Sequence, residues 1–435
     1  MENIRFGFAE NPITPLPHEV MMDGYGHRTM PCEGVRTDVF VKTAVLSTKK
    51  ETLYFIALDI CGFDEALMNL INEHIYYHCK VDTSKIVYTA THTHTGPIGG
   101  LLLEQGRSII YWNKTAEIIA RTLKKSIDNL EEGSLEIKVC DKELNYIYNR
   151  MGREDIDRRV FLAVFKNLKG ELKGVITSAS CHCTCLGDML ISGDYPAKMY
   201  ELMKKEYPNL PVLFLAGRGG DTNPVRPQIP DSVELFEKLG KDFYEVISDG
   251  LKNLSGEKEE NFDLREIRET IEVPCQENLL SVEEYEKRIE KEYAFMYSED
   301  TPLKKRWVVP EINYLKACRD VVKYNLSRSV KAELQVFKIN KESIFVFLPF
   351  ELLCRTGNLV EEEMIKLGYK KGKIFVIGYA NANKSYLPPK KYCHENRYDI
   401  KGRDAATHWG GRLEYSDKSE DAVIEGIISL VKKLK

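Results

Sequence analysis

The sequence contains no apolar run approaching ~18 residues, the length that a membrane-spanning helix needs. Its first residues, Met1 to Phe8, have neither the basic flank nor the apolar core of a signal peptide. No sign of charge dominates, because the net charge is only −4, so no broad basic field invites nucleic acid. Internal repeats, low-complexity tracts and glycine/serine linkers are also missing. We therefore expect a single domain over residues 1–435.

A disulfide framework is also absent. The eleven cysteines are odd in number and scattered without the spacing of a disulfide-rich scaffold. Since no export signal is seen, they predict reduced thiols and a cytoplasmic protein. Hydrophobic residues make up 43% and charged residues 29% of the chain, which is typical of a globular protein.

Segments with β-forming composition alternate with segments of helical periodicity along the whole chain. This order predicts an α/β fold with a large mixed β-sheet, flanking helices and a site at the strand ends. Residues 1–30 are expected to form a short apolar stretch and then an extended loop. The expected strands are 39–47, 52–60, 86–91, 134–139, 160–165, 174–180, 211–216, 332–339, 343–349 and 373–379. The expected helices are 63–79, 111–130, 197–206, 232–251 and 421–433.

Residues 256–324 differ from the rest in composition, being highly charged. They predict a mostly helical insertion, with helices at 282–297 and 309–324 and a break containing Pro302. The insertion could form a lid over the site. The alternative is a solvated helical pair packed on the sheet.

The segment from Tyr88 to Pro97 carries two histidines where a predicted strand runs into a turn. If the strand stays extended, His92 and His94 project to one side, about 6–7 Å apart along the strand. Imidazole is the commonest side-chain metal ligand. The alternative is two partly buried histidines that are hydrogen-bonded to the backbone.

Polar clusters follow several predicted strands, which suggests one crevice assembled from several loops. Two histidines and one carboxylate from separate elements, with an open position, form the pattern of a catalytic zinc site. The candidate residues of this crevice are His92, His94, His182, Glu351 and Tyr386.

Cys181, Cys183 and Cys185 surround His182 at a period of two and would face away from it in an extended segment. They are either metal ligands or small buried residues. The glycine-rich turn Gly217–Asp221 lacks the Lys-Ser/Thr of a phosphate loop. A backbone that donates N–H groups to an oxyanion fits this turn better.

Several short segments, in order along the chain, carry a resemblance. They are Asn11–Pro15, Met22–Tyr25, Asp59, Thr91–Pro97, Asn149–Arg150, Cys181–His182, Ile191–Asp194, Phe350–Glu351 and Ser385–Leu387. Thr91-His-Thr-His-Thr-Gly-Pro97 resembles the Thr-His-Thr-His-Ser-Gly-Pro signature of the neutral/alkaline non-lysosomal ceramidases, and the other segments are similar to further motifs of that family.

The resemblance implies a zinc amidohydrolase domain. Carried over residue by residue, it implies that His92, His182, Glu351 and Tyr386 hold Zn²⁺. His94 would lie beside the metal and assist proton transfer or bind substrate. Arg150 would contact the polar head of a small-molecule or N-acyl lipid substrate.

The sequence also departs from this family. Asn223 stands where the family has its active-site serine, in Gly220-Asp-Thr-Asn-Pro-Val225, and the family's carboxy-terminal immunoglobulin-like domain has no counterpart. Asn223 could still donate a hydrogen bond to an oxyanion, and we expect Gly220, Asp221 and Thr222 to line the substrate site.

Three functions follow from these features. The leading hypothesis is a zinc-dependent hydrolase that cleaves an amide bond with metal-activated water, using His94, Asn223 and Tyr386 in catalysis. The second is a hydrolase of a small polar or sugar-derived metabolite at the same zinc site. The third is a catalytically silent ligand-binding homologue.

Overall fold

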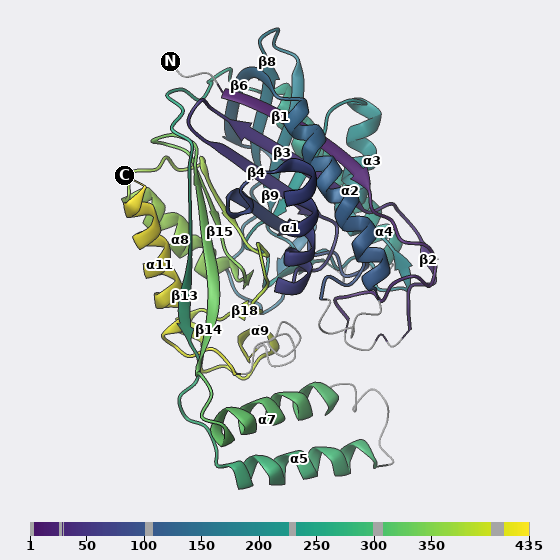
Figure 1. The fold of residues 1–435 in the computed structure, drawn as a ribbon, viewed down its shortest axis with the longest axis vertical. Helices are drawn as coiled ribbons and strands as arrows, with labels where there is room; N and C mark the ends of the chain where they lie inside the picture. The colour runs from purple at the N-terminus through teal and green to yellow at the C-terminus, as the bar shows by residue number, and fades with distance from the viewer. Residues whose placement is uncertain are drawn as a thin grey trace.

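The computed structural model describes residues 4–25, 28, 30–100, 108–225, 232–298, 308–401 and 413–434. It confirms the predicted α/β fold with a large mixed sheet (Figure 1). Two pairs of this eight-stranded sheet, β4 with β5 and β9 with β11, are parallel, and the others are antiparallel. In spatial order its strands are β11 (Val212–Ala216), β9 (Leu172–Ala179), β8 (Phe161–Asn167), β6 (Glu131–Val139), β1 (Ile4–Pro12), β3 (Phe40–Ser47), β4 (Thr52–Leu58) and β5 (Ile86–Ala90).

A second sheet of four strands packs face to face against the first. Phenylalanine rings fill the space between the sheets. The Phe55 ring of β4 lies 5.2 Å from Phe337 and 6.0 Å from Phe347, measured between ring centroids. In spatial order the strands of the second sheet are β13 (Arg265–Pro274), β14 (Ser329–Lys338), β15 (Ile344–Phe347) and β17 (Ile374–Ile377).

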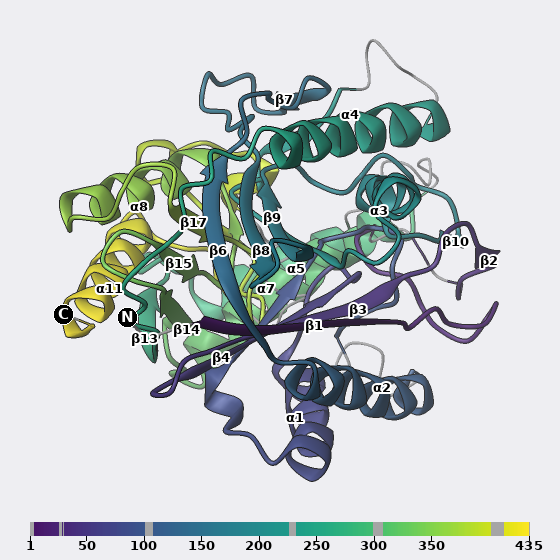
Figure 2. The same ribbon diagram turned by 90° about the horizontal axis from the view of Figure 1, so that it is seen from above.

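Helices cover the outer face of each sheet, which gives four layers (Figure 2). The large sheet is covered by α1 (Glu65–Cys79), α2 (Ile109–Asp128), α3 (Asp194–Glu206) and α4 (Ser232–Lys252). The small sheet is covered by α8 (Cys354–Lys366) and α11 (Ser419–Lys433). Because the strands are buried on both faces, their sequences read as continuous apolar runs. In β15, for example, Phe345 and Phe347 face the inner core, while Ile344 and Val346 face the helices.

The short apolar stretch expected at the start of the chain forms strand β1, which had not been predicted as a strand. It lies in the middle of the large sheet, between β6 and β3. Ile4, Phe6 and Phe8 alternate into the inner core. A Cβ atom on Gly7 would lie 2.0 Å from the backbone oxygen of Ser126, so this glycine allows α2 to pack closely on the strand.

The expectation of a mostly helical segment 256–324 is partly wrong. Its first part contains β13, in which Ile267, Ile271 and Val273 pack toward α11 while charged residues alternate with them. The two predicted helices are present as α5 (Val282–Met296) and α7 (Val308–Lys323), and Pro302 lies outside the described residues. This helical pair connects β13 to β14 and projects away from the two sheets (Figure 1).

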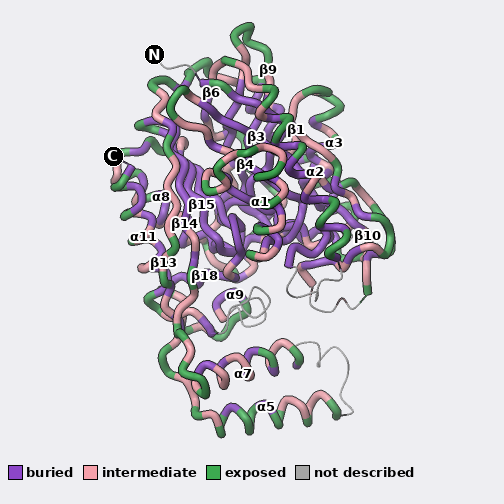
Figure 3. The backbone as a smooth tube through the Cα atoms, viewed as in Figure 1, coloured by how far each residue is buried: buried purple, intermediate pink, exposed green. Residues whose placement is uncertain are grey.

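The core of the protein is therefore the double-sheet body (Figure 3). The α5/α7 pair is largely exposed or half-buried, and a small separate cluster holds the two helices together. Among the described helices, none is long and apolar enough to cross a membrane.

Three pairs of short strands complete the described elements, and two of them border the candidate site. The pairs are β2 (Gly34–Val35) with β10 (Leu190–Ile191), β7 (Ile147–Asn149) with β12 (Thr222–Pro224), and β16 (Glu351–Leu352) with β18 (Tyr386–Leu387). Short helices lie at η1 (Thr83–Lys85), η2 (Lys390–Tyr392) and α9 (Tyr398–Lys401).

Candidate metal centre

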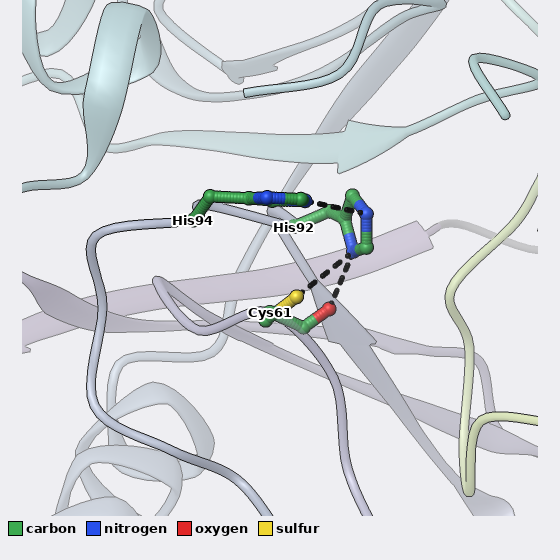
Figure 4. Close-up of side chains that lie close together, drawn as sticks. All are labelled: Cys61, His92 and His94. Carbon is green, nitrogen blue, oxygen red and sulfur yellow. Dashed lines mark hydrogen bonds between the residues drawn. The ribbon is translucent and has the colours of Figure 1, made fainter. Parts of the chain in front are cut away.

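His92 and His94 follow the end of β5 and converge on each other. The strand ends at Ala90, and His92 adopts a left-handed conformation with φ of 63°. The expected extended arrangement, with side chains about 6–7 Å apart along a strand, is therefore wrong. Because the chain turns at His92, the two Nε2 atoms lie only 3.2 Å apart (Figure 4).

His182 reaches the same place from the end of β9. Its backbone N–H donates to Thr222, and its Nδ1 lies 2.7 Å from the carbonyl oxygen of Gly219. The segment after it is held by the buried Asp194 carboxylate, which accepts N–H groups from Cys185 and Leu186. This contact gives the Ile191–Asp194 motif a structural role.

The three cysteines around His182 are buried and not directed at it as ligands. Cys183 donates its thiol to the carbonyl of Thr91, 3.0 Å away, and Cys181 donates to the carbonyl of His182. Burial raises the pKa of the Cys181, Cys183 and Cys185 thiols well above the ordinary value, so they stay protonated. Their interpretation as small buried residues agrees with this arrangement.

Glu351 and Tyr386 close the cluster from the two-stranded sheet of β16 and β18. They are paired residues of the parallel strands β16 and β18. Oε2 of Glu351 lies 3.2 Å from Nε2 of His92 and 3.4 Å from Nε2 of His182. The Tyr386 hydroxyl lies 3.4 Å from the same His182 nitrogen. All five crevice residues predicted from the sequence are thus brought together.

The hydrogen bonds of His92 and His182 determine which nitrogen of each ring carries the hydrogen and which is free to bind a metal. Nδ1 of His92 lies 2.7 Å from the carbonyl oxygen of Cys61, and Nδ1 of His182 is equally close to that of Gly219. A carbonyl only accepts, so in each ring Nδ1 carries the hydrogen and, in the neutral form, Nε2 presents a lone pair. Both lone pairs face Oε2 of Glu351, which has no hydrogen-bond partner among the described residues.

The protonation states of His182 and Glu351 also favour the binding of a metal cation. Burial lowers the pKa of His182 to about 4, so this imidazole is neutral at pH 7. Burial opposes ionisation of Glu351, but attraction to His92 and His182 in their protonated forms outweighs burial and holds the pKa of this carboxyl well below its usual range. The inner nitrogens of His92 and His182 and the Glu351 carboxylate oxygen are buried close together, and they are a donor set for a metal cation.

Arg150 borders the metal cluster on the side of Tyr386, with its guanidinium 5.4 Å from that ring. Its guanidinium donates to both carboxylate oxygens of Asp399 in α9 and to the carbonyl of Gly220. It also donates to Oδ1 of Asn223, 3.4 Å away. No sequence pattern points to Asp399, because a lone aspartate in a polar segment is usually a surface residue.

Comparison with known proteins bears on this geometry directly. Residues 5–209 match the family described as neutral/alkaline non-lysosomal ceramidase, N-terminal. The predicted resemblance to this family is confirmed. His92, His94, Arg150 and His182 lie within the matched residues, while Glu351 and Tyr386 lie beyond them and are brought to the site by the fold.

Two solved ceramidase structures share this fold over the whole chain. The crystal structure of neutral ceramidase from Pseudomonas aeruginosa aligns with a TM-score of 0.76 at 16% identity, covering 100% of this chain and 75% of that chain. A ceramidase complexed with C2 aligns with a TM-score of 0.75 at 15% identity and the same coverage. At this level of identity the likeness establishes the fold.

The glycine-rich turn that follows β11 was expected to donate backbone N–H groups to an oxyanion, and two of these groups are already bonded. The N–H of Gly220 donates to Leu352 and that of Thr222 donates to Gly219, so neither is available to an oxyanion. The buried Asp221 carboxylate accepts from Asn149 and from the backbone of Cys354. The turn therefore holds His182 and the neighbouring segments in place, and only Asn223 within it is half-exposed.

Cys61 is a neighbour of the site that sequence reasoning missed. Besides its carbonyl, its Sγ lies 3.5 Å from Nδ1 of His92, and its thiol forms a second possible ligand group with His92 and His94 (Figure 4). Burial raises the pKa of this thiol well above the ordinary value. A protonated thiol is a poor ligand, so the group of His92, His182 and Glu351 fits a cation better.

His94 is held in place from outside by the loop after Val20. The Tyr25 ring packs edge-on at 5.0 Å, and Arg28 donates to the His94 carbonyl. A Cβ atom on Gly24 would lie 2.4 Å from the His94 ring, so only glycine permits this approach.

Proposed function

We propose that the protein is a zinc-dependent hydrolase of the ceramidase type that cleaves an N-acyl amide bond. The observation that carries the proposal is the convergence of two imidazole lone pairs and one carboxylate oxygen on a single buried point. At angles near the tetrahedral value, zinc bonds of about 2.0–2.1 Å place neighbouring ligand atoms about 3.4 Å apart. The observed spacings of 3.2 and 3.4 Å fit this requirement.

In this proposal, His92, His182, Glu351 and Tyr386 hold Zn²⁺. The ion supplies a bound water with a pKa lowered to about 7 and polarises the carbonyl of the substrate. Cys61 and Gly219 contribute by accepting the Nδ1 hydrogens of the two histidines. Such outer hydrogen bonds fix the tautomer and orientation of metal-binding imidazoles.

His94 is the proposed proton carrier. Burial, and then the neighbouring imidazoles of His92 and His182, lower the pKa of His94 well below its ordinary value. The ring is therefore neutral at pH 7 and can take up a proton from the attacking water and return it to the leaving amine. Tyr25 and Arg28 support this role by restricting how the ring can move.

Arg150, Asn223 and Asp399 are the proposed contacts for the polar end of the substrate. The Arg150 charge is balanced by Asp399, so this patch does not present an uncompensated cation. It suits a neutral head with hydroxyl or amide groups better than an anionic one. The Oδ1 end of Asn223 is committed to Arg150, which leaves its Nδ2 end as the donor for a substrate oxygen.

A catalytically silent ligand-binding homologue is the second candidate. It is favoured by Asn223, because an amide cannot act as the nucleophile or proton carrier that a serine could be. Ligand binding without turnover by the zinc-loaded protein would support this candidate.

Residues 1–435 are proposed to act as one catalytic unit, since the proposed ligands come from segments that follow strands of both sheets. Movement of the α5/α7 pair as a lid and a cytoplasmic location stay predictions.

The test is a hydrolysis screen with zinc-loaded protein. N-acyl amides with hydroxylated heads are compared with sugar amides and with esters, and Glu351→Gln serves as the metal-site control. Cleavage of N-acyl amides by the wild type, lost in Glu351→Gln, supports the proposal. Cleavage of sugar amides alone favours the polar-metabolite hydrolase. Cleavage that survives in Glu351→Gln contradicts the proposed site.

A further inference from the structure

Tyr379 lies beside the cluster of His92 and His182, in contact with both rings. Its ring packs on the imidazole of His92, with ring centroids 4.2 Å apart and planes inclined by 30°. The same ring meets His182 edge-on, with centroids 6.1 Å apart. Tyr379 is only 2% exposed, so its ring forms a wall of the cluster and not of the surface.

The backbone of Tyr379 ties together the segments that carry the proposed ligands. Its N–H donates to the carbonyl of Phe350, the residue directly before Glu351, at 2.9 Å. Its own carbonyl accepts the N–H of Ala90, the last residue of β5 before the histidine segment, at 3.2 Å. Tyr379 thus contacts both the segment that leads from the small sheet to Glu351 and the segment that leads from the large sheet to the histidines.

Tyr379 also adopts an unusual backbone conformation. Its φ is 53°, in the left-handed region that an aromatic residue rarely occupies. Such conformations cost roughly 1–3 kcal/mol and persist where the surroundings impose them, often at functional sites. Of the nine described non-glycine residues with a positive φ, four lie in the segments that build this cluster, namely Tyr379, His92, Asn381 and Ser385.

The hydroxyl of Tyr379 is fully buried and has no hydrogen-bond partner among the described residues. A phenol O–H can donate one hydrogen bond and accept others. A buried hydroxyl without a partner is costly in a folded protein. An oxygen of a ligand or of ordered water would satisfy it.

We propose that Tyr379 is a positioning residue of the metal centre. Its ring holds the His92 imidazole with Nε2 directed at Glu351, and its hydroxyl donates to an oxygen bound within the cluster. The inference rests on the proposed metal site. It goes beyond that proposal by adding a residue that is not a ligand and by separating the role of its ring from that of its hydroxyl.

Two variants separate these roles. Tyr379→Phe keeps the ring and removes the hydroxyl, whereas Tyr379→Leu removes both. Tyr369→Leu is a matched control, because Tyr369 is a buried tyrosine in the outer core of the small sheet. Zinc affinity is measured by competition with a chromophoric chelator, and the visible spectrum of the Co²⁺-substituted protein reports the ligand geometry.

We expect Tyr379→Leu to weaken zinc binding by about 10–100-fold, as loss of an outer support for a metal ligand does. Its Co²⁺ spectrum should change, while Tyr379→Phe and Tyr369→Leu should bind zinc nearly as the wild type does. Loss of the hydroxyl in Tyr379→Phe should lower kcat and leave KM and zinc affinity unchanged. Zinc affinity of Tyr379→Leu within twofold of the wild type would overturn the positioning role.

A measurement on the metal-free protein distinguishes this inference from the proposed function. Nitrogen-15 NMR of the histidine rings reports whether the His92 hydrogen sits on Nδ1. We expect a single Nδ1–H form in the wild type and Tyr379→Phe, and a mixture of tautomers in Tyr379→Leu. If the wild type binds no zinc but this difference is seen, the proposed function fails and the positioning role stands. An unchanged tautomer in Tyr379→Leu overturns the positioning role whether or not zinc binds.

Discussion

Nε2 of His92 lies 3.2 Å from Oε2 of Glu351, although the two residues come from different sheets. His92 follows β5 of the large sheet, and Glu351 begins β16, which follows β15 of the small sheet. Only the packing of one sheet on the other brings these atoms together. The unfolded chain therefore has no preformed site, and binding of a metal must be coupled to folding.

Zinc is expected to stabilise the folded protein. At a free zinc concentration 100-fold above Kd, the free energy of unfolding should rise by about 2.7 kcal/mol, because the ion binds only the folded form. Urea denaturation with and without zinc measures this change. Glu351→Gln should lose the effect, and His78→Ala, on the outer helix α1, should keep it. An equal zinc effect in Glu351→Gln would place the ion elsewhere.

The Arg150–Asp399 pair yields a stability prediction. Both side chains are mostly buried, with 19% and 7% exposed. Arg150→Met should destabilise the protein by about 3–5 kcal/mol, because it leaves the Asp399 carboxylate buried without its partner. The double variant Arg150→Met/Asp399→Leu should lose less stability, because no charge is then buried without a partner. Chemical denaturation measures both, and a double variant that is worse than the single one would contradict the account.

Asn223 should affect turnover more than binding. If its Nδ2 donates to the developing oxyanion, Asn223→Ala should lower kcat by about 10²–10³-fold and leave KM little changed. Steady-state kinetics on the N-acyl amide found in the screen measure this. An unchanged kcat would remove Asn223 from the catalytic residues. Turnover that appears only in Asn223→Ser would support the silent homologue.

A buried charge network below the site predicts how stability depends on pH. Glu361 accepts from Arg159 and from Arg218, at 2.7 Å to each. Burial opposes its ionisation, but these guanidinium groups outweigh burial and lower the pKa of Glu361 below the ordinary value. Its stabilising contribution is thus present above the ordinary pKa and lost as pH falls through the lowered one.

The wild type should therefore lose more unfolding free energy than Glu361→Gln does when pH is lowered from 7 toward 3. Denaturant titrations at several pH values measure the two slopes. Parallel slopes for the two proteins would show that the Glu361 carboxylate is not linked to folding. The site residues are not involved in this comparison, so it tests the fold alone.

Much of the fold could be predicted from the sequence because the two-faced burial of the central strands leaves long apolar signals. One exception is β13, whose Arg and Glu residues alternate with Ile267 and Ile271. It is the edge strand of the small sheet, so one of its faces carries charges and its sequence imitates a solvated helix. Strand β1 was not predicted because a glycine interrupts its short apolar segment and several prolines follow it closely.

Only part of the candidate site could be predicted from the sequence. His92, His182 and Glu351 carry their chemistry in their side chains, at the ends of recognisable strands. The contributions of Cys61 and Gly219 come from backbone carbonyls, which any residue supplies. Asp399 and Tyr379 meet the site only through tertiary packing, so no local pattern points to them.

Metal content tests the central claim most directly. The protein is purified without chelator, offered zinc and then dialysed, and its zinc is measured by elemental analysis beside that of His92→Ala and His78→Ala. We expect about one zinc per chain in the wild type and His78→Ala, and loss of that zinc in His92→Ala. Absence of zinc from the wild type, or full zinc occupancy in His92→Ala, would contradict it.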